Sequence, residues 1–153
     1  PVWHEELYKN RACSISTKCV FIKSGETVDF LKTESPDLAT IRGFGQNDEF
    51  KDARLKNSEV IKVDTISLFD MLEQCNAPEE IDYLSIDTEG TEYGILNAFF
   101  MHNANKYKIN TITVEHNFGE IRNKIEELLK KNGYEKKFAE MSRWDDFYVR
   151  VKS

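Results

Sequence analysis

The pattern of apolar and polar positions is clearest in residues 81–100. Apolar residues are almost unbroken over 81–86, which is typical of a strand covered on both faces. The acids Asp87 and Glu89 follow, and Gly90 allows a sharp turn. Apolar side chains at helical spacing then occupy 93–100. A strand, a turn and a helix in this order are the repeating unit of an open α/β sheet, in which ligands bind beyond the carboxyl ends of the strands.

The remaining patterns predict further strands and helices in alternation. A Ser-Gly turn at 24–25 joins the first two strands, and the polar segment 46–58 is expected to be a surface loop. The order favours one α/β domain over 1–153, with a mainly parallel sheet, helices on both faces and an antiparallel C-terminal edge. Strands are predicted at 14–23, 26–31, 38–44, 59–63, 109–115, 135–141 and 146–151, and further helices at 4–11, 67–75 and 121–132. Ser67 is the expected N-cap of the second of these helices, and Gly133 is expected to end the third.

Composition narrows the classes of partner. The 153 residues are 40% hydrophobic and 31% charged, as in ordinary globular proteins, and the net charge of −6 argues against a nucleic-acid partner. Apolar runs are too short for a membrane-spanning helix. Three scattered cysteines favour free thiols in a reducing compartment, so we expect a cytoplasmic protein. The first residue is Pro1 and not Met, which suggests a fragment or a processed product.

Two polar clusters follow neighbouring predicted strands. Asp87 and Glu89 come after the first, where a carboxylate can act as a base or face a positive charge; alternatively, Asp87 caps the next helix and Glu92 complements its dipole. The second cluster, 115–117, contains His116, which can take up a proton near neutrality or be a loop histidine bonded to a neighbour. In a parallel sheet both clusters lie at one edge.

Other chemistries have little support in the sequence. A zinc site made by His116, Asp87 and Glu89 would lack a further ligand, because no motif places His4 or His102 nearby, so we expect no metal. Neither a Gly-x-Ser-x-Gly motif nor a positioned Cys-His pair is present, which argues against nucleophilic catalysis.

The segment 81–96, IDYLSIDTEGTEYGIL, resembles the signature of the FkbM family of S-adenosylmethionine-dependent methyltransferases. That signature is a strand reading IDxLxID followed by xEGxExxIL. Weaker agreement extends over nearly the whole chain, in the correct order, at 9–13, 25–30, 63–68, 115–117 and 133–134.

The resemblance implies a Rossmann-like sheet that binds S-adenosylmethionine across its strand ends and O-methylates a hydroxyl of a sugar or natural product. It places Asp87 near the methionine end of the cofactor, and Glu89 and His116 toward the acceptor. Phe21 and Ile22 match the position where such enzymes hold the adenine. The reaction is an in-line displacement that depends mainly on positioning.

The family's glycine-rich loop and its ribose-binding acid would lie upstream of Pro1, so we expect the N-terminal strands to be missing. The strands at 14–23 and 84–87 should then pair directly, or a second copy should cover the exposed edge as a homo-oligomer. Two alternatives to an enzyme of this kind stay open: a non-catalytic, truncated binding module, and a metal-dependent hydrolase using Asp87, Glu89 and His116.

Overall fold

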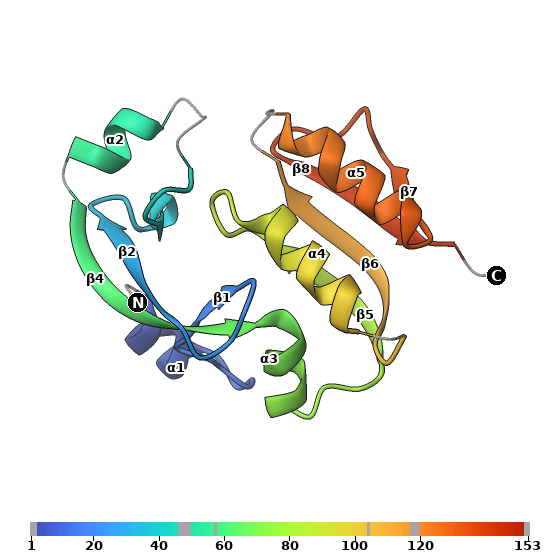
Figure 1. Ribbon diagram of the computed structural model, residues 1–153, viewed down its shortest axis with the longest axis horizontal. Coiled ribbons are helices and arrows are strands. Elements are labelled where there is room, and N and C mark those ends of the chain that lie inside the picture. Colours follow the sequence, from blue (N-terminus) through green and yellow to red (C-terminus); the bar gives the residue numbers. More distant parts are fainter. Residues whose placement is uncertain (1–2, 46–49, 57, 104, 117–119, 152–153) are drawn as a thin grey trace.

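The computed structural model describes residues 3–45, 50–56, 58–103, 105–116 and 120–151, and it contains two four-stranded sheets within them (Figure 1). The first has the order β1-β4-β2-β3 and the second β5-β6-β8-β7. In chain order the elements are α1 (His4–Asn10), β1 (Cys19–Phe21), β2 (Thr27–Thr33), the 3₁₀ helix η1 (Pro36–Leu38), β3 (Thr40–Ile41), α2 (Lys51–Lys56), β4 (Ser58–Ser67), α3 (Leu68–Gln74), β5 (Glu80–Ile86), α4 (Glu92–His102), β6 (Lys108–Glu115), α5 (Ile121–Lys131), β7 (Tyr134–Lys137) and β8 (Asp145–Arg150).

The expectation of one mainly parallel sheet is wrong. Only β1 with β4 and β5 with β6 are parallel, and the other strand pairs are antiparallel. The reason lies in the first sheet, where β4 runs back along the whole of β2, from Thr27 opposite Asp64 to Thr33 opposite Ser58. In β4 exposed residues alternate with half-buried ones over 61–64, whereas in β2 only Thr27 is exposed.

Several predicted boundaries also change. The strand expected at 14–23 is only Cys19–Phe21, and it pairs with β4, neither with β2 as a hairpin nor with β5. The loop expected at 46–58 contains α2, while 46–49 and 57 lie outside the described residues. Among the described strands β5 pairs with β6 alone. Cover of its other edge by a second copy stays a prediction, which small-angle scattering can test.

The helices and the second sheet follow the sequence more closely. Ser67 caps α3, as its spacing predicts: its side-chain oxygen accepts a hydrogen bond from the Asp70 amide at 3.1 Å. Gly133, with φ of +84°, ends α5. The strand β5 is less buried than its apolar run suggests, because Tyr83 on its open face is 57% exposed.

The core lies between α3, α4 and α5 and one face of the second sheet. α4 crosses in front of β5 and β6 in Figure 1, and it also contacts α3, α5, β1 and β4. Its fully buried side chains are Ile95, Leu96 and Phe99, which join Ile112 and Val114 of β6 in one cluster. α4 therefore connects the two sheets through the core.

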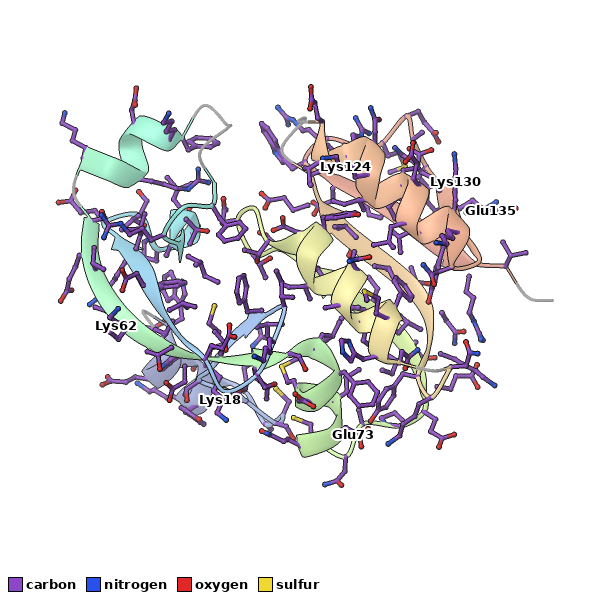
Figure 2. The ribbon with its side chains drawn as sticks, viewed as in Figure 1. Lys18, Lys62, Glu73, Lys124, Lys130 and Glu135 are labelled. Carbon is purple, nitrogen blue, oxygen red and sulfur yellow. The ribbon has the colours of Figure 1, made fainter. Side chains whose placement is uncertain are left out.

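The charged side chains labelled in Figure 2 are all exposed: Lys18, Lys62, Glu73, Lys124, Lys130 and Glu135.

Candidate active site

The turn after β5 is held by Glu92, the first residue of α4. Its carboxylate accepts hydrogen bonds from the backbone amides of Thr88 at 2.8 Å and Gly90 at 3.0 Å. Glu89 adopts a left-handed φ of +57° and Gly90 one of +108°. Thr91, the residue before α4, makes no side-chain cap. Glu92, and not Asp87, therefore satisfies the amides at this turn, which leaves Asp87 exposed at the strand end.

A buried arginine from the first sheet's connecting segment fixes the same turn. Arg54 of α2 is 2% exposed, donates to the carbonyl oxygens of Leu38 at 3.0 Å and Gly45 at 2.6 Å, and forms an ion pair with Glu89. The Thr40 hydroxyl donates to the Glu89 carbonyl oxygen at 2.8 Å. A Cβ at Gly90 would lie 2.8 Å from the Gly45 nitrogen, so the two backbones touch. The turn is therefore held on one side by Arg54 and Thr40 and on the other by Glu92.

Three carboxylates meet beside this turn: Asp87, Glu89 and Glu115. One oxygen from each lies within 4.8 Å of the others. β5 and β6 are parallel with Ile86 opposite Val114, so the next residues, Asp87 and Glu115, leave the same edge on the same face. Asp145 of β8 lies opposite Glu115 on that face. We call Asp87, Glu89 and Glu115 the carboxylate cluster.

Glu115 is the most enclosed member, with 9% of the residue exposed. Burial, followed by the negative charges of Asp87 and Glu89, raises the pKa of Glu115 to about 9. Its Oε2 atom is buried and has no hydrogen-bond partner among the described residues. A protonated Glu115 can donate a hydrogen bond to the Asp87 carboxylate, whereas an ionised one would face two other acceptors with no donor.

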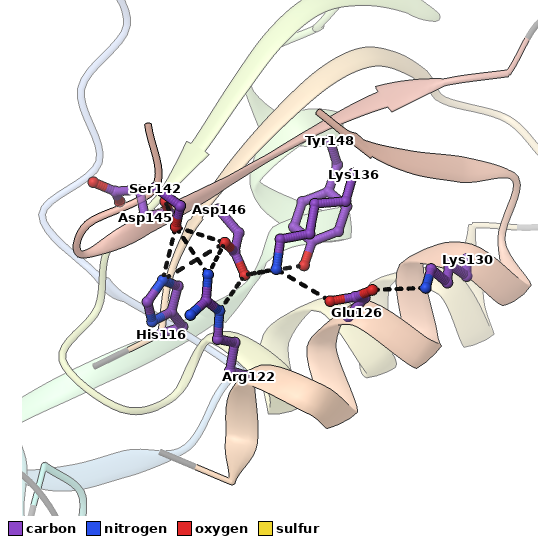
Figure 3. Close-up of polar contacts among 9 residues, drawn as sticks. All are labelled: His116, Arg122, Glu126, Lys130, Lys136, Ser142, Asp145, Asp146 and Tyr148. Atoms are coloured by element: carbon purple, nitrogen blue, oxygen red, sulfur yellow. Dashed lines mark hydrogen bonds and ion pairs between the residues drawn. The ribbon is translucent and has the colours of Figure 1, made fainter. Parts of the chain in front are cut away.

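His116 lies on the other face of β6, inside a network of buried charges (Figure 3). It is 2% exposed, and its Nε2 lies 3.3 Å from the Ser142 hydroxyl and 3.7 Å from Asp146. Asp146 accepts two hydrogen bonds from Arg122, at 2.7 and 2.8 Å, and one from Lys136 at 2.8 Å. Burial lowers the pKa of His116, against the opposing effect of the Asp146 charge.

The residues expected at the adenine lie near the same turn. The Phe21 ring contacts the Phe44 ring edge-on, with centroids 5.8 Å apart, and Phe44 in turn reaches the backbone of Gly90. Ile22 is exposed and packs on Gly94, in the first turns of α4. The structure therefore brings Phe21 and Ile22 to the region of Asp87, whereas it encloses His116 on the opposite face of β6.

Two functional candidates escaped the sequence reasoning. Glu115 belongs to the polar cluster 115–117, but the sequence prediction chose His116 from that cluster. In the parallel register Ile86 lies opposite Val114, so Glu115, and not His116, is on the same face as Asp87. Arg54 gave no signal, because 46–58 has neither helical nor strand periodicity.

A cavity of about 360 Å³ lies at the other end of the second sheet, lined by residues that include Met101, Tyr107, Lys108 and Arg150. Lys108 and Arg150 are the first residue of β6 and the last of antiparallel β8, so the cavity is far along the strands from the carboxylate cluster. It is not part of the candidate site.

Two mixed sheets joined by α4 define an α/β protein, and its acids lie at the carboxyl ends of two parallel strands, where ligands of open α/β sheets bind. The chain belongs to the methyltransferase FkbM domain family, whose model matches residues 3–136. No match was found among curated proteins or among solved structures. None of the helices in the described part of the chain has the length and hydropathy needed to cross a lipid bilayer.

Proposed function

We propose that this protein is an S-adenosylmethionine-dependent methyltransferase that methylates a hydroxyl group of a sugar or natural product. Its family membership supports methyl transfer. The observation that carries the proposal is the meeting of Asp87 and Glu115 at the carboxyl ends of β5 and β6, beside the turn that Arg54 holds. Ligands of open α/β sheets collect at such strand ends.

The residues at this edge fit the chemistry of the cofactor. S-adenosylmethionine carries positive charges on its sulfonium and ammonium groups, and a cluster of acids attracts both. The aromatic ring of Phe21 and the exposed side chain of Ile22 offer an apolar surface suited to the adenine. Asp87 is the exposed acid of the cluster and is therefore the one placed to contact a ligand directly.

When bound, the cofactor supplies the electrophilic methyl group. The chain's own part is to place the acceptor oxygen in line and to receive its proton. Asp87 is the proposed base, because its carboxylate is exposed beside the fixed turn. Arg54 and Glu92 keep Glu89 and the backbone of this turn in one position. The role predicted for His116 at the acceptor requires access to an imidazole that is enclosed by Ser142 and Asp146.

Calorimetric titration of S-adenosylmethionine into the chain, in buffer containing EDTA, tests cofactor binding. We expect saturable binding in the micromolar range, weakened at least tenfold by Asp87→Asn because a carboxylate facing the cofactor's positive charge is lost. Asp82→Asn is the matched control, since Asp82 is an exposed acid of the same strand. The absence of heat at millimolar cofactor would refute the proposal and favour a non-catalytic binding module.

Transfer of a labelled methyl group from the cofactor to a panel of sugars and hydroxylated natural products tests the reaction itself. We expect Asp87→Asn to reduce turnover at saturating cofactor, whereas Asp82→Asn should not. His116→Asn separates the two predicted roles of the histidine. A change in turnover with unchanged thermal stability supports a role at the acceptor, and a loss of stability alone supports a purely structural one.

A further inference from the structure

We propose that the carboxylate cluster of Asp87, Glu89 and Glu115 binds a hard divalent cation of about the size of Ca²⁺. Carboxylate oxygens are the preferred ligands of such ions. The cluster brings together oxygens from the turn after β5 and from the end of β6, within 4.8 Å of one another. The sequence predicts no metal, because His116, Asp87 and Glu89 lack a further ligand. In the structure Glu115 takes the place of His116 beside the two acids, and water would complete the shell of an ion there.

The buried oxygen of Glu115 is the observation that points to a ligand. Glu115 is 91% buried, and its Oε2 receives no hydrogen bond from a donor among the described residues. The side chain faces the Asp87 carboxylate, another acceptor, with which it shares a hydrogen bond only while one of the two holds a proton. A buried polar atom without a partner is costly, so such an atom calls for an ion or a water that satisfies it. A cation satisfies it and also removes the repulsion between the three acids.

The spacing of the oxygens leaves room for a large ion. Oxygen ligands lie up to about 2.6 Å from Ca²⁺, so two oxygens on one ion can be up to about 5.2 Å apart. The separations in the cluster are no greater than 4.8 Å, within that limit. Mg²⁺ holds its ligands at about 2.1 Å, which allows only about 4.2 Å across the ion, and it gives up its water reluctantly. The upper limit of 4.8 Å therefore lies within the reach of Ca²⁺ and beyond that of Mg²⁺.

The local charge also matches a divalent ion. Once an ion has taken the place of the Glu115 proton, the three carboxylates carry three negative charges, and the Arg54 guanidinium, paired with Glu89, offsets one of them. Arg54 also fixes Glu89, as partners of metal ligands commonly do. Asp145, opposite Glu115 on β8, adds a further negative charge at the edge of the site. Asp87 is exposed, so an ion can reach the cluster from solvent.

The competing occupant of the cluster is a proton held between Glu115 and Asp87. In that case the cluster needs no ion, and added cations should not bind. If a cation does bind, then, on the proposed methyltransferase function, its remaining positions can take the acceptor hydroxyl. The ion would favour loss of the hydroxyl proton to Asp87 or to water. Binding itself does not depend on that role.

The test is calorimetric titration of CaCl₂, and separately of MgCl₂, into the chelator-treated full chain without S-adenosylmethionine. We expect one saturable site, with a Ca²⁺ dissociation constant on the order of 10⁻⁴–10⁻³ M, and weaker binding of Mg²⁺. Glu115→Gln and Asp87→Asn should each weaken Ca²⁺ binding at least tenfold. Glu79→Gln, an exposed acid at the opposite end of β5, removes the same charge and should change it less than twofold.

Circular dichroism of each variant shows that it is folded, and Asp87→Asn decides the matter if Glu115→Gln is not, because Asp87 is exposed. The proposal is overturned if the wild type binds no Ca²⁺ at 10 mM, roughly tenfold above the weakest affinity expected. Binding that the folded cluster variants retain overturns it too. Ca²⁺ binding without methyl transfer would refute the proposed function and leave the site intact. Methyl transfer unaffected by EDTA, in a chain that binds no cation, would do the reverse.

Discussion

Replacing Asp146 with Asn should destabilise the fold more than any other single change of charge in the second sheet. The side chain is 1% exposed and accepts hydrogen bonds from Arg122, Lys136 and Ser142 at 2.7–2.8 Å. An amide has the same shape but no charge, so the guanidinium and the ammonium lose their common partner. Removing one member of a buried ion pair typically costs about 3–5 kcal/mol. The free energy of unfolding of a whole domain is about 5–15 kcal/mol, so a loss of this size should be easily measured.

Urea denaturation at pH 7, followed by circular dichroism, gives the free energy of unfolding for wild type and variant. Asp145→Asn is the matched control, because the neighbouring acid has the opposite environment: burial, with the charges of Asp87 and Asp146, raises its pKa. Its replacement should change the free energy of unfolding by less than about 1 kcal/mol or increase it. A loss below about 1 kcal/mol for Asp146→Asn would refute the reasoning.

The contribution of Asp146 to the free energy of unfolding depends on pH in a defined way. Hydrogen bonds from Arg122, Lys136 and Ser142 hold the pKa of Asp146 well below its usual value of 3.8, against the opposing effect of burial. A group whose pKa falls on folding stabilises the native state above its unfolded pKa and loses that contribution as the pH decreases. The difference in the free energy of unfolding between wild type and Asp146→Asn should therefore be constant above pH 5 and decrease below pH 4. A difference that grows in acid would contradict this.

Three further changes concern the turn after β5. Gly90→Ala should cost about 3 kcal/mol, because its positive φ is strained for alanine and the new Cβ meets the Gly45 nitrogen; Gly133→Ala, with open space around it, should cost about 1 kcal/mol, and equal losses in thermal denaturation would contradict the clash. Glu92→Gln should cost about 1–3 kcal/mol and speed hydrogen exchange of the Gly90 amide, because a neutral amide oxygen accepts these bonds more weakly than a carboxylate; an unchanged exchange rate would contradict this. Arg54→Lys should lower the free energy of unfolding in urea by about 2–4 kcal/mol, because one ammonium cannot bind the Leu38 and Gly45 carbonyls and the Glu89 carboxylate together. A loss near zero would count against the role of Arg54 in holding the turn.

The elements that the sequence predicted well are those with local signals. Ser67 and Gly133 mark the start of α3 and the end of α5, because a cap and a positive φ depend only on neighbouring residues. The apolar run before Asp87 and the strand ending at Glu115 pair in parallel, as the alternation of strands and helices predicts.

The first sheet shows why the rest could not be predicted. The order of polar and apolar residues at 27–33 and 58–67 predicts strands but does not specify the partner of either strand. Pairing is decided by contacts between residues far apart in the sequence. Arg54 illustrates the same limit for the site. Its value comes from Leu38, Gly45 and Glu89, which lie 9 to 35 positions away, and no local period announces such a residue.

The grip of Arg54 on the turn has a consequence for how the protein can be divided. The acids of the candidate site lie at the ends of β5 and β6 and in the turn between β5 and α4, yet the conformation of Glu89 depends on Thr40 of β3 and Arg54 of α2, from the earlier part of the chain. A fragment beginning at Glu80 would keep the acids and lose the two side chains that fix their arrangement. Ligand affinity in such a fragment should fall even where its strands still pair, so the earlier segment behaves as an integral part of the site.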